Sequence, residues 1–296
     1  MTILKTISNR IDTLSDEKQH LLGLSLVLLA SLCFSVSNTL VKHLTALYSS
    51  FIVVFWRGWV GIVILLLVTR FKVRLLCGVN RKILFLRGVI GTIALTCFFS
   101  SIKYTTLSNA IGIFNTFPTM ATLVGILFFK EKWRKIYILA LIFSLMGVWY
   151  IARPEIGVIR SGDMLALCGA FCAAWVINLV RYLRKTDSVF SIVFYLLIIA
   201  TIVSFVPAGV HEIMRSFQNW GGLMLVAIFT TSAQILMTAG YTYCTATCGS
   251  IVSLMTLPLT LLFSILFIKE SFTVQLGIGA ALIFFSGYLV TMNPAD

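Results

Sequence analysis

Long stretches without a charged residue dominate this amino-acid sequence. A helix needs about 20 mostly apolar residues to cross the roughly 30 Å hydrocarbon core of a bilayer. The long uncharged stretches, of 15 residues or more, are residues 21–41, 88–102, 104–129, 136–152, 164–180, 188–210, 216–268 and 271–295. One further stretch, residues 51–69, is interrupted only by Arg57. The sequence therefore predicts an all-α integral membrane protein.

Composition argues against the soluble alternatives. Hydrophobic residues make up 59% of the chain and charged residues only 11%, whereas a soluble chain carries about 25% charged residues. The sequence has no His-Glu-x-x-His, Gly-x-Ser-x-Gly or Gly-Lys-Thr motif, so it gives no sign of metalloprotease, serine-hydrolase or phosphate-loop chemistry. We therefore expect no enzymatic activity, no metal site and no cofactor.

The stretch from residue 216 to residue 268 is too long for a single crossing. Its 53 residues would form a helix about 80 Å long, so we expect two spans that fold back near Cys244 to Gly249. The predicted total is ten transmembrane helices. Residues 1–20 precede the first span and carry apolar residues at helical spacing. They are expected to stay uncleaved and to form a cytoplasmic amphipathic segment.

Lys and Arg are distributed unevenly between the two predicted sides of the membrane. The side that carries the N-terminus holds 16 of these residues and the opposite side holds 6. Because short cytoplasmic loops are enriched in Lys and Arg, both termini are predicted to be cytoplasmic. The same asymmetry assigns the formal net charge of +13 to loops that face anionic membrane lipids, so no nucleic-acid partner is expected.

The sequence also repeats itself with an offset of 139 to 140 residues. Within the longer matching segments, Pro118 aligns with Pro258. We therefore expect two five-helix repeats, residues 21–152 and residues 163–292. Five is an odd number of crossings, so the second repeat enters the membrane upside down relative to the first. Inverted repeats of this kind place a solute site near the membrane midplane and exchange roles during alternating access.

Several short motifs add a resemblance to a known family. These motifs are Phe55-Trp56-Arg57-Gly58 in the second span, Leu86-Arg87-Gly88 at the start of the third, the Pro118 segment, and the closing pairs Lys130-Glu131 and Lys269-Glu270. With the duplicated ten-span pattern, they resemble the EamA-type branch of the drug/metabolite transporter superfamily over about residues 20–292. Both closing pairs have Lys where the family usually has Gly. The resemblance implies a multi-pass carrier of small-molecule solutes in a bacterial inner membrane, as a monomer or homodimer.

Arg57 is the only charged residue inside a predicted span, about six residues from its outer end. A guanidinium in hydrocarbon needs a partner, an interface or water. One interpretation is structural, with Arg57 reaching the outer interface or capping neighbouring carbonyls. The other is functional, with Arg57 attracting a carboxylate or phosphate of the solute. Lys42 and Lys103 are predicted at the same level, where they would form a basic vestibule.

Polar stripes along the apolar spans supply the other candidates. Polar side chains on a span turn away from lipid, where they either join helices or contact solute. Amides are harder to satisfy within one helix than hydroxyls. The predicted substrate-binding residues are therefore Asn38, Arg57, Asn115, Asn178, Gln234, Tyr241 and Trp175, with the two aromatic residues stacking on solute or packing in the core. Pro118 and Pro258 are predicted mid-span kinks, either purely structural or acting as hinges.

These features favour a secondary transporter of small amphipathic metabolites, amino-acid-like or related organic solutes, that exports or exchanges them by alternating access. An exchanger of anionic or nucleotide-containing metabolites is the alternative, and a lipid scramblase is less favoured. No Asp, Glu or His lies in the interior of any predicted span. Because intramembrane acids usually serve as proton or cation sites, their absence favours exchange or facilitated movement over strict proton coupling.

Overall fold

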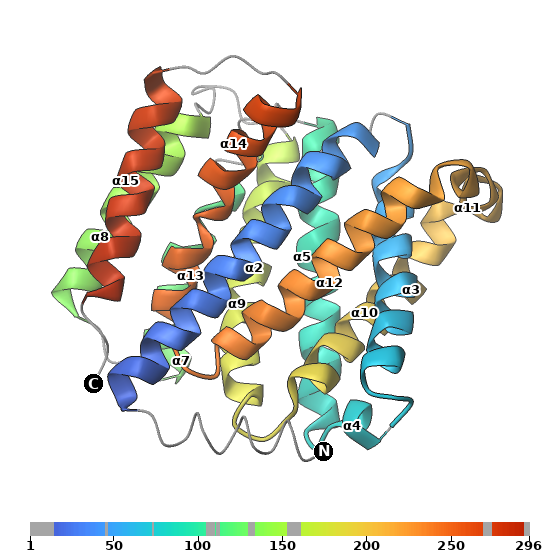
Figure 1. The fold of residues 1–296 in the computed structure, drawn as a ribbon, viewed down its shortest axis with the longest axis horizontal. Helices are drawn as coiled ribbons and strands as arrows, with labels where there is room; N and C mark the ends of the chain where they lie inside the picture. The colour runs from blue at the N-terminus through green and yellow to red at the C-terminus, as the bar shows by residue number, and fades with distance from the viewer. Residues whose placement is uncertain are drawn as a thin grey trace.

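The computed structural model describes residues 15–44, 47–72, 74–104, 110, 113–129, 134–152, 161–268 and 274–292, and this part of the chain consists of helices and turns (Figure 1). The helices are α2 (Asp16–Leu44), α3 (Ser50–Val68), α4 (Arg74–Cys77), α5 (Arg81–Tyr104), α7 (Phe117–Phe129), α8 (Lys135–Ala152), α9 (Ser161–Leu183), α10 (Val189–Ala208), α11 (Val210–Ser216), the 3-10 turn η1 (Phe217–Asn219), α12 (Trp220–Gly240), α13 (Ala246–Ser253), α14 (Thr256–Ile268) and α15 (Val274–Thr291).

Seven helical segments in the described part are long and apolar enough to cross a membrane. Two of them combine neighbouring helices, because α11 to α12 form the segment Val210–Gly240 and α13 to α14 form Ala246–Phe267. Shorter apolar helices, α7, α8 and α15, occupy places where the sequence predicts further spans. The structure therefore supports a multi-pass fold, while the count of ten spans and the cytoplasmic termini stay predictions.

The helix bounds follow the sequence repeat. The bounds of α14 and α15 lie 139 residues after those of α7 and α8, respectively. The packing follows it too, because α5 packs on α9 as α2 packs on α12, and α7 packs on α9 as α14 packs on α2. In Figure 1, α2 runs from the lower to the upper edge and its counterpart α9 runs back. Corresponding helices of the two repeats therefore make corresponding contacts while running in opposite directions.

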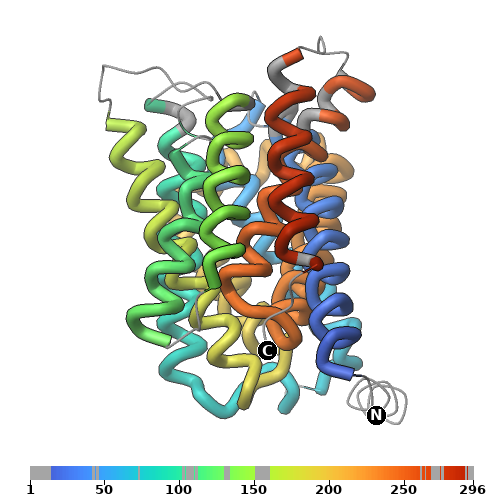
Figure 2. The backbone as a smooth tube through the Cα atoms, turned by 90° about the vertical axis from the view of Figure 1, so that its left-hand side faces the viewer, coloured from blue at the N-terminus to red at the C-terminus, as the bar shows by residue number. Residues whose placement is uncertain are grey.

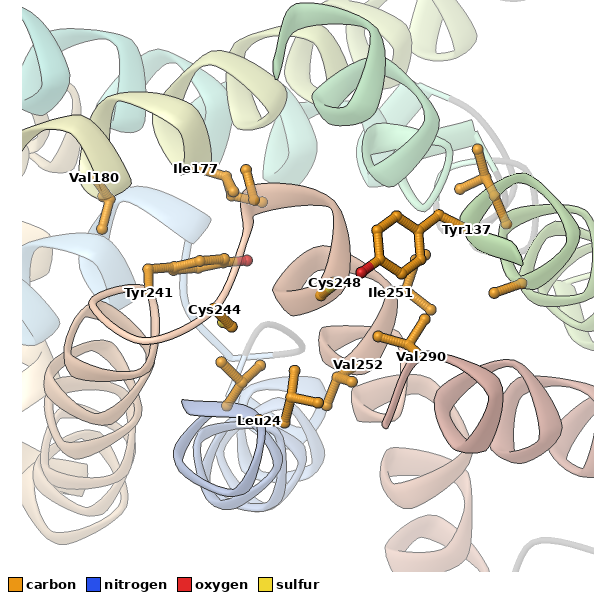
Figure 3. Packing of buried hydrophobic residues seen from close by; sticks show 14 of the residues in the cluster. Leu24, Tyr137, Ile177, Val180, Tyr241, Cys244, Cys248, Ile251, Val252 and Val290 are labelled. Atoms are coloured by element: carbon orange, nitrogen blue, oxygen red, sulfur yellow. The ribbon is translucent and has the colours of Figure 1, made fainter. Parts of the chain in front are cut away.

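The two repeats share a hydrophobic core. Leu24 of α2 and Ile177 of α9 belong to one buried cluster with Tyr241, Ile251 and Val252, which come from the end of α12 and from α13 (Figure 3). Tyr241 and Ile251 are completely buried. Since α2 belongs to the first repeat and the other elements to the second, this cluster holds the repeats together.

The helix of the first span begins before the predicted uncharged stretch, and a later turn lies close to the predicted fold-back. Helix α2 begins at Asp16, so residues 16–20 of the predicted amphipathic segment lie in the same helix as the first span. The rest of that predicted segment, residues 1–14, lies outside the described residues. Farther along, the chain turns at residues 241–245 between α12 and α13, which overlaps the fold-back expected at Cys244 to Gly249.

The two prolines do not sit in the middle of continuous helices. Pro118 is the second residue of α7 and Pro258 is the third residue of α14. Each follows a break in the helix, at residues 115–116 and residues 254–255. A proline in the first turn needs no N–H partner, so it fits there without loss of a helical hydrogen bond. The predicted kinks are therefore interruptions at equivalent places in the two repeats.

Helix α4 lies at the lower edge of the helices in Figures 1 and 2, and polar contacts join the chain after it to the turn after α9. The buried carboxylate of Asp187 accepts hydrogen bonds from the backbone N–H groups of Val79 at 2.5 Å and Asn80 at 3.3 Å. Arg184 donates to the hydroxyl of Thr242 at 2.8 Å and to the carbonyl of Asp187. Burial lowers the pKa of Arg184. These bonds connect the loop before α5 with turns of the second repeat.

Candidate functional site

Arg57 lies inside the helix bundle and makes its hydrogen bond there. It is seven residues from the start of α3, about 10 Å along the helix axis, and is 8% exposed. Its Nη2 donates a hydrogen bond of 3.2 Å to Oε1 of Gln234 on α12. The bond joins a helix of the first repeat to one of the second. Both residues were predicted to bind solute, and the structure brings them together in the interior.

Arg87 is the residue that the sequence interpretation placed wrongly. Arg87 is one of the 16 basic residues that the charge count assigns to the cytoplasmic side, yet it is the seventh residue of α5 and is completely buried. Its guanidinium nitrogens Nε, Nη1 and Nη2 have no hydrogen-bond partner among the described residues. A lone charge at the centre of a membrane helix is unfavourable by about 3 kcal/mol or more, so this arrangement needs an explanation.

The Arg87 side chain extends further into the bundle. Its Nη1 would lie 3.8 Å from a Cβ atom placed on Gly91, so the guanidinium reaches one helical turn beyond its own backbone. Gly91 is ten residues into α5, about 15 Å from the start of the helix, which is half the thickness of a hydrocarbon core. At this level α5 and α3 pack on neighbouring residues of α10, because a Cβ atom on Gly91 would lie 2.9 Å from Leu196 and one on Gly61, one turn from Arg57, would lie 2.9 Å from Leu197.

The face of α12 that meets α3 is polar. Thr231, Gln234 and Thr238 follow one another at helical spacing and are all buried. The hydroxyls of Thr231 and Thr238 have no hydrogen-bond partner in the described part of the chain. Thr231 faces α3, because a Cβ atom on Gly61 would lie 2.7 Å from its Oγ1. The candidate site therefore consists of two arginines, one amide and two hydroxyls, from three helices of both repeats.

Two of the predicted binding residues serve packing. Asn178 donates from its side-chain nitrogen to the carbonyl of Ala121 at 2.9 Å and to that of Ala174 at 3.0 Å. Both N–H groups of its amide are thus used to join α9 to α7. Trp175 is surrounded by other rings, with its centroid 4.9 Å from that of Phe128. These contacts match the interhelical and core alternatives that the sequence left open.

The other predicted residues are scattered. Asn38 is exposed on α2, and Asn115 is partly buried in the break before α7. Tyr241 is completely buried in the core cluster of Figure 3. The side chains of Lys42 and Lys103 lie outside the described residues, so the basic vestibule stays a prediction. Among the predicted residues, the structure thus brings Arg57 and Gln234 together.

A signal for Arg87 was present in the sequence. Four apolar residues, Ile83 to Leu86, precede it, and α5 begins before them at Arg81. Counting only charge-free residues started the third span at residue 88 and thereby left Arg87 outside.

Within the described residues, no group of three or more His, Cys, Asp or Glu side chains is arranged to hold a metal ion.

Comparison with known proteins establishes the family. A model described as the EamA-like transporter family matches residues 21–153 and 160–292. The chain belongs to the EamA-like transporter family. It is accordingly a multi-pass membrane transporter built from two repeats, of the drug/metabolite transporter type that its motifs resemble.

Individual relatives of this transporter agree with the family. The pseudopaline exporter CntI of Pseudomonas aeruginosa is 27% identical over 228 residues, which are 76% of this chain and 80% of the exporter. An uncharacterized transporter of Helicobacter pylori is 26% identical over 288 residues, covering 92% of this chain and 95% of the relative. One solved crystal structure superposes with a TM-score of 0.74 at 15% identity, over 94% of this chain and 98% of its own. That likeness concerns the fold alone.

Proposed function

We propose that this EamA-like protein is a secondary transporter of the bacterial inner membrane that moves small organic metabolites by alternating access, through export or exchange, and has no enzymatic activity. The observation that carries the proposal is the buried hydrogen bond between Arg57 and Gln234. It joins polar groups of both repeats inside the helix bundle, which is where inverted-repeat carriers bind solute. Export is further supported by the similarity to the pseudopaline exporter.

The charge of the site favours the anionic alternative over amino-acid-like solutes. Among the described residues, Asp187 is the only buried carboxylate, and it is held by the backbone at the lower edge. Arg57 and Arg87 therefore have no acidic side chain shown beside them. Two cations without a counter-charge attract anionic solutes most strongly, which supports an exchanger of anionic metabolites as the narrower version of the proposal.

The proposal is tested by measuring flux in liposomes that contain the purified protein. The liposomes are loaded with isotopically labelled succinate, leucine and putrescine, which represent an anion, a zwitterion and a cation, and efflux is followed by mass spectrometry. We expect protein-dependent efflux that Gln234→Leu reduces and that Lys185→Gln, a change at an exposed position, leaves unchanged. Efflux no faster than from protein-free liposomes, for all three solutes and with external counter-solute, would count against transport of small metabolites.

A further inference from the structure

No buried acidic side chain that the structure describes neutralises the charges of the two buried arginines. Each guanidinium carries five N–H donors in a planar fork. The three guanidinium nitrogens of Arg87 have no hydrogen-bond partner in the part of the chain that the structure describes, and the bond from Arg57 goes to the neutral amide of Gln234. Burying a charge without a counter-charge destabilises a folded protein strongly. An arrangement of this kind persists where another molecule supplies the missing charge.

The two charges also act on each other. Arg57 and Arg87 come from different helices, α3 and α5, which pack on neighbouring residues of α10 at the same level, so their like charges repel. A low dielectric constant strengthens such repulsion. An anion placed between the two groups would add two attractions that outweigh the one repulsion. A single ligand would therefore accept hydrogen bonds from the unused donors and offset the electrostatic repulsion.

The surroundings of the pair suit an oxyanion. The hydroxyls of Thr231 and Thr238 lack partners among the described residues and can donate to anionic oxygen. The buried carboxylate of Asp187 does not compete, because its oxygens accept from the backbone N–H groups of Val79 and Asn80. The site is thus rich in donors and contains no acidic group that the structure describes.

We propose that Arg57 and Arg87 together bind an oxyanion group of the transported solute, a carboxylate or a phosphate, with Thr231, Gln234 and Thr238 beside it. This inference rests on the proposed transport function and narrows its solute class to organic anions. The guanidinium fork matches both oxyanions with paired hydrogen bonds. An amino-acid zwitterion fits less well, because its ammonium group would lie near two cations with no carboxylate of the protein to receive it.

Thermal unfolding of the purified full-length protein in detergent tests the binding. The probes are succinate, inorganic phosphate and the neutral analogue succinamide, at matched ionic strength. We expect succinate or phosphate to raise the melting temperature, since a ligand of the folded state stabilises it, and the one that does so identifies the oxyanion. Arg57→Met and Arg87→Met should weaken the apparent affinity about tenfold or more, whereas Arg81→Met, an exposed change on the same helix as Arg87, should not.

Any of three results of this experiment overturns the site. The first is that neither anion shifts the melting temperature of the wild-type protein more than succinamide does. The second is that the anion-induced shift survives in both Arg57→Met and Arg87→Met. A shift lost equally in the control Arg81→Met would also overturn it, because the anion would then act through general surface charge.

Stability without ligand provides an independent readout. Methionine is apolar and fills the space of the arginine's aliphatic stem, so Arg87→Met removes the unbalanced buried charge and leaves only the place of the guanidinium unfilled. We expect the ligand-free variant to melt at the wild-type temperature or above it. A clearly lower melting temperature would contradict the proposal, because the charge would then hold the fold together and would not be reserved for a ligand.

The flux experiment separates this inference from the proposed function. If leucine or putrescine leaves the liposomes in a protein-dependent way and Arg87→Met transports it normally, transport stands and the anion site fails. If the anion stabilises the protein through Arg57 and Arg87 while no solute moves, the site stands and transport fails.

Discussion

The close approach of the α2 and α12 backbones gives a sharp test of the packing. Gly240 ends α12 beside α2, and a Cβ atom there would lie 2.8 Å from the carbonyl oxygen of Gly23 and 2.7 Å from Cγ2 of Val27. Ordinary contact begins at 3.4 Å, so Gly240→Ala requires the helices to separate by about 0.6 Å at the carbonyl. Val27 is completely buried and has no room to move away.

The expected effect follows from two opposing contributions. Forcing extra volume into a packed interface destabilises by about 1–3 kcal/mol, while replacing glycine by alanine in a helix stabilises by about 0.5–1 kcal/mol. Overpacking is the larger contribution, so Gly240→Ala should lower the free energy of unfolding by about 1–2 kcal/mol. At about 2–4 °C per kcal/mol, the melting temperature should fall by about 2–8 °C.

The matched control lies at the other end of the same helix. A Cβ atom on Gly221 would have nothing within 4 Å, so Gly221→Ala carries only the gain in helix propensity and should melt at or slightly above the wild-type temperature. The two positions are far apart, so the double variant should show the sum of the single effects. If Gly240→Ala melts as high as Gly221→Ala, then α2 and α12 do not approach as closely as the structure shows.

Three further predictions concern topology, coupling and packing. A cysteine introduced at exposed Gln218 should react with a membrane-impermeant maleimide from outside intact cells, whereas one at exposed Lys185 should react only after permeabilisation; the reverse pattern would invert the predicted orientation. A proton gradient alone should not drive solute accumulation in proteoliposomes, while preloaded counter-solute should accelerate flux; uptake that an uncoupler abolishes without counter-solute would contradict exchange. Trp56→Phe should destabilise the protein by about 1 kcal/mol, because it removes the 2.8 Å hydrogen bond to the Ser216 hydroxyl. Thermal melts of Trp56→Phe, Ser216→Ala and the double variant should show that the two effects are coupled. Strictly additive effects would show that the bond contributes nothing.

Much of the fold was predictable because it depends on local pattern. Apolar length selects helices that fit a bilayer, and repetition of the sequence selects repetition of structure. The equivalent bounds of α7 and α14, and of α8 and α15, show the second effect directly. The fold-back between α12 and α13 was likewise visible in the sequence, since a 53-residue apolar stretch exceeds what one crossing can hold.

Local pattern was less informative wherever a side chain has alternative partners. Asn178 and Gln234 are both amides on polar stripes, and the sequence treats them alike. In the folded chain, Asn178 gives both its N–H groups to backbone carbonyls of α7 and α9, while Gln234 meets Arg57. Only the arrangement of neighbouring helices decides which amide is used in packing and which remains beside a charge.

Arg87 shows the same division most clearly. The sequence alone determined that the chain has helical spans in two repeats, and it provided an arginine near the start of the third span. Whether that charge lies in a loop or in the interior depends on where α5 begins and on which helices cover it. The tertiary structure buries Arg87, because packing of α5 against α9 and α10 encloses a position that, in a linear count of charges, belongs to the membrane surface.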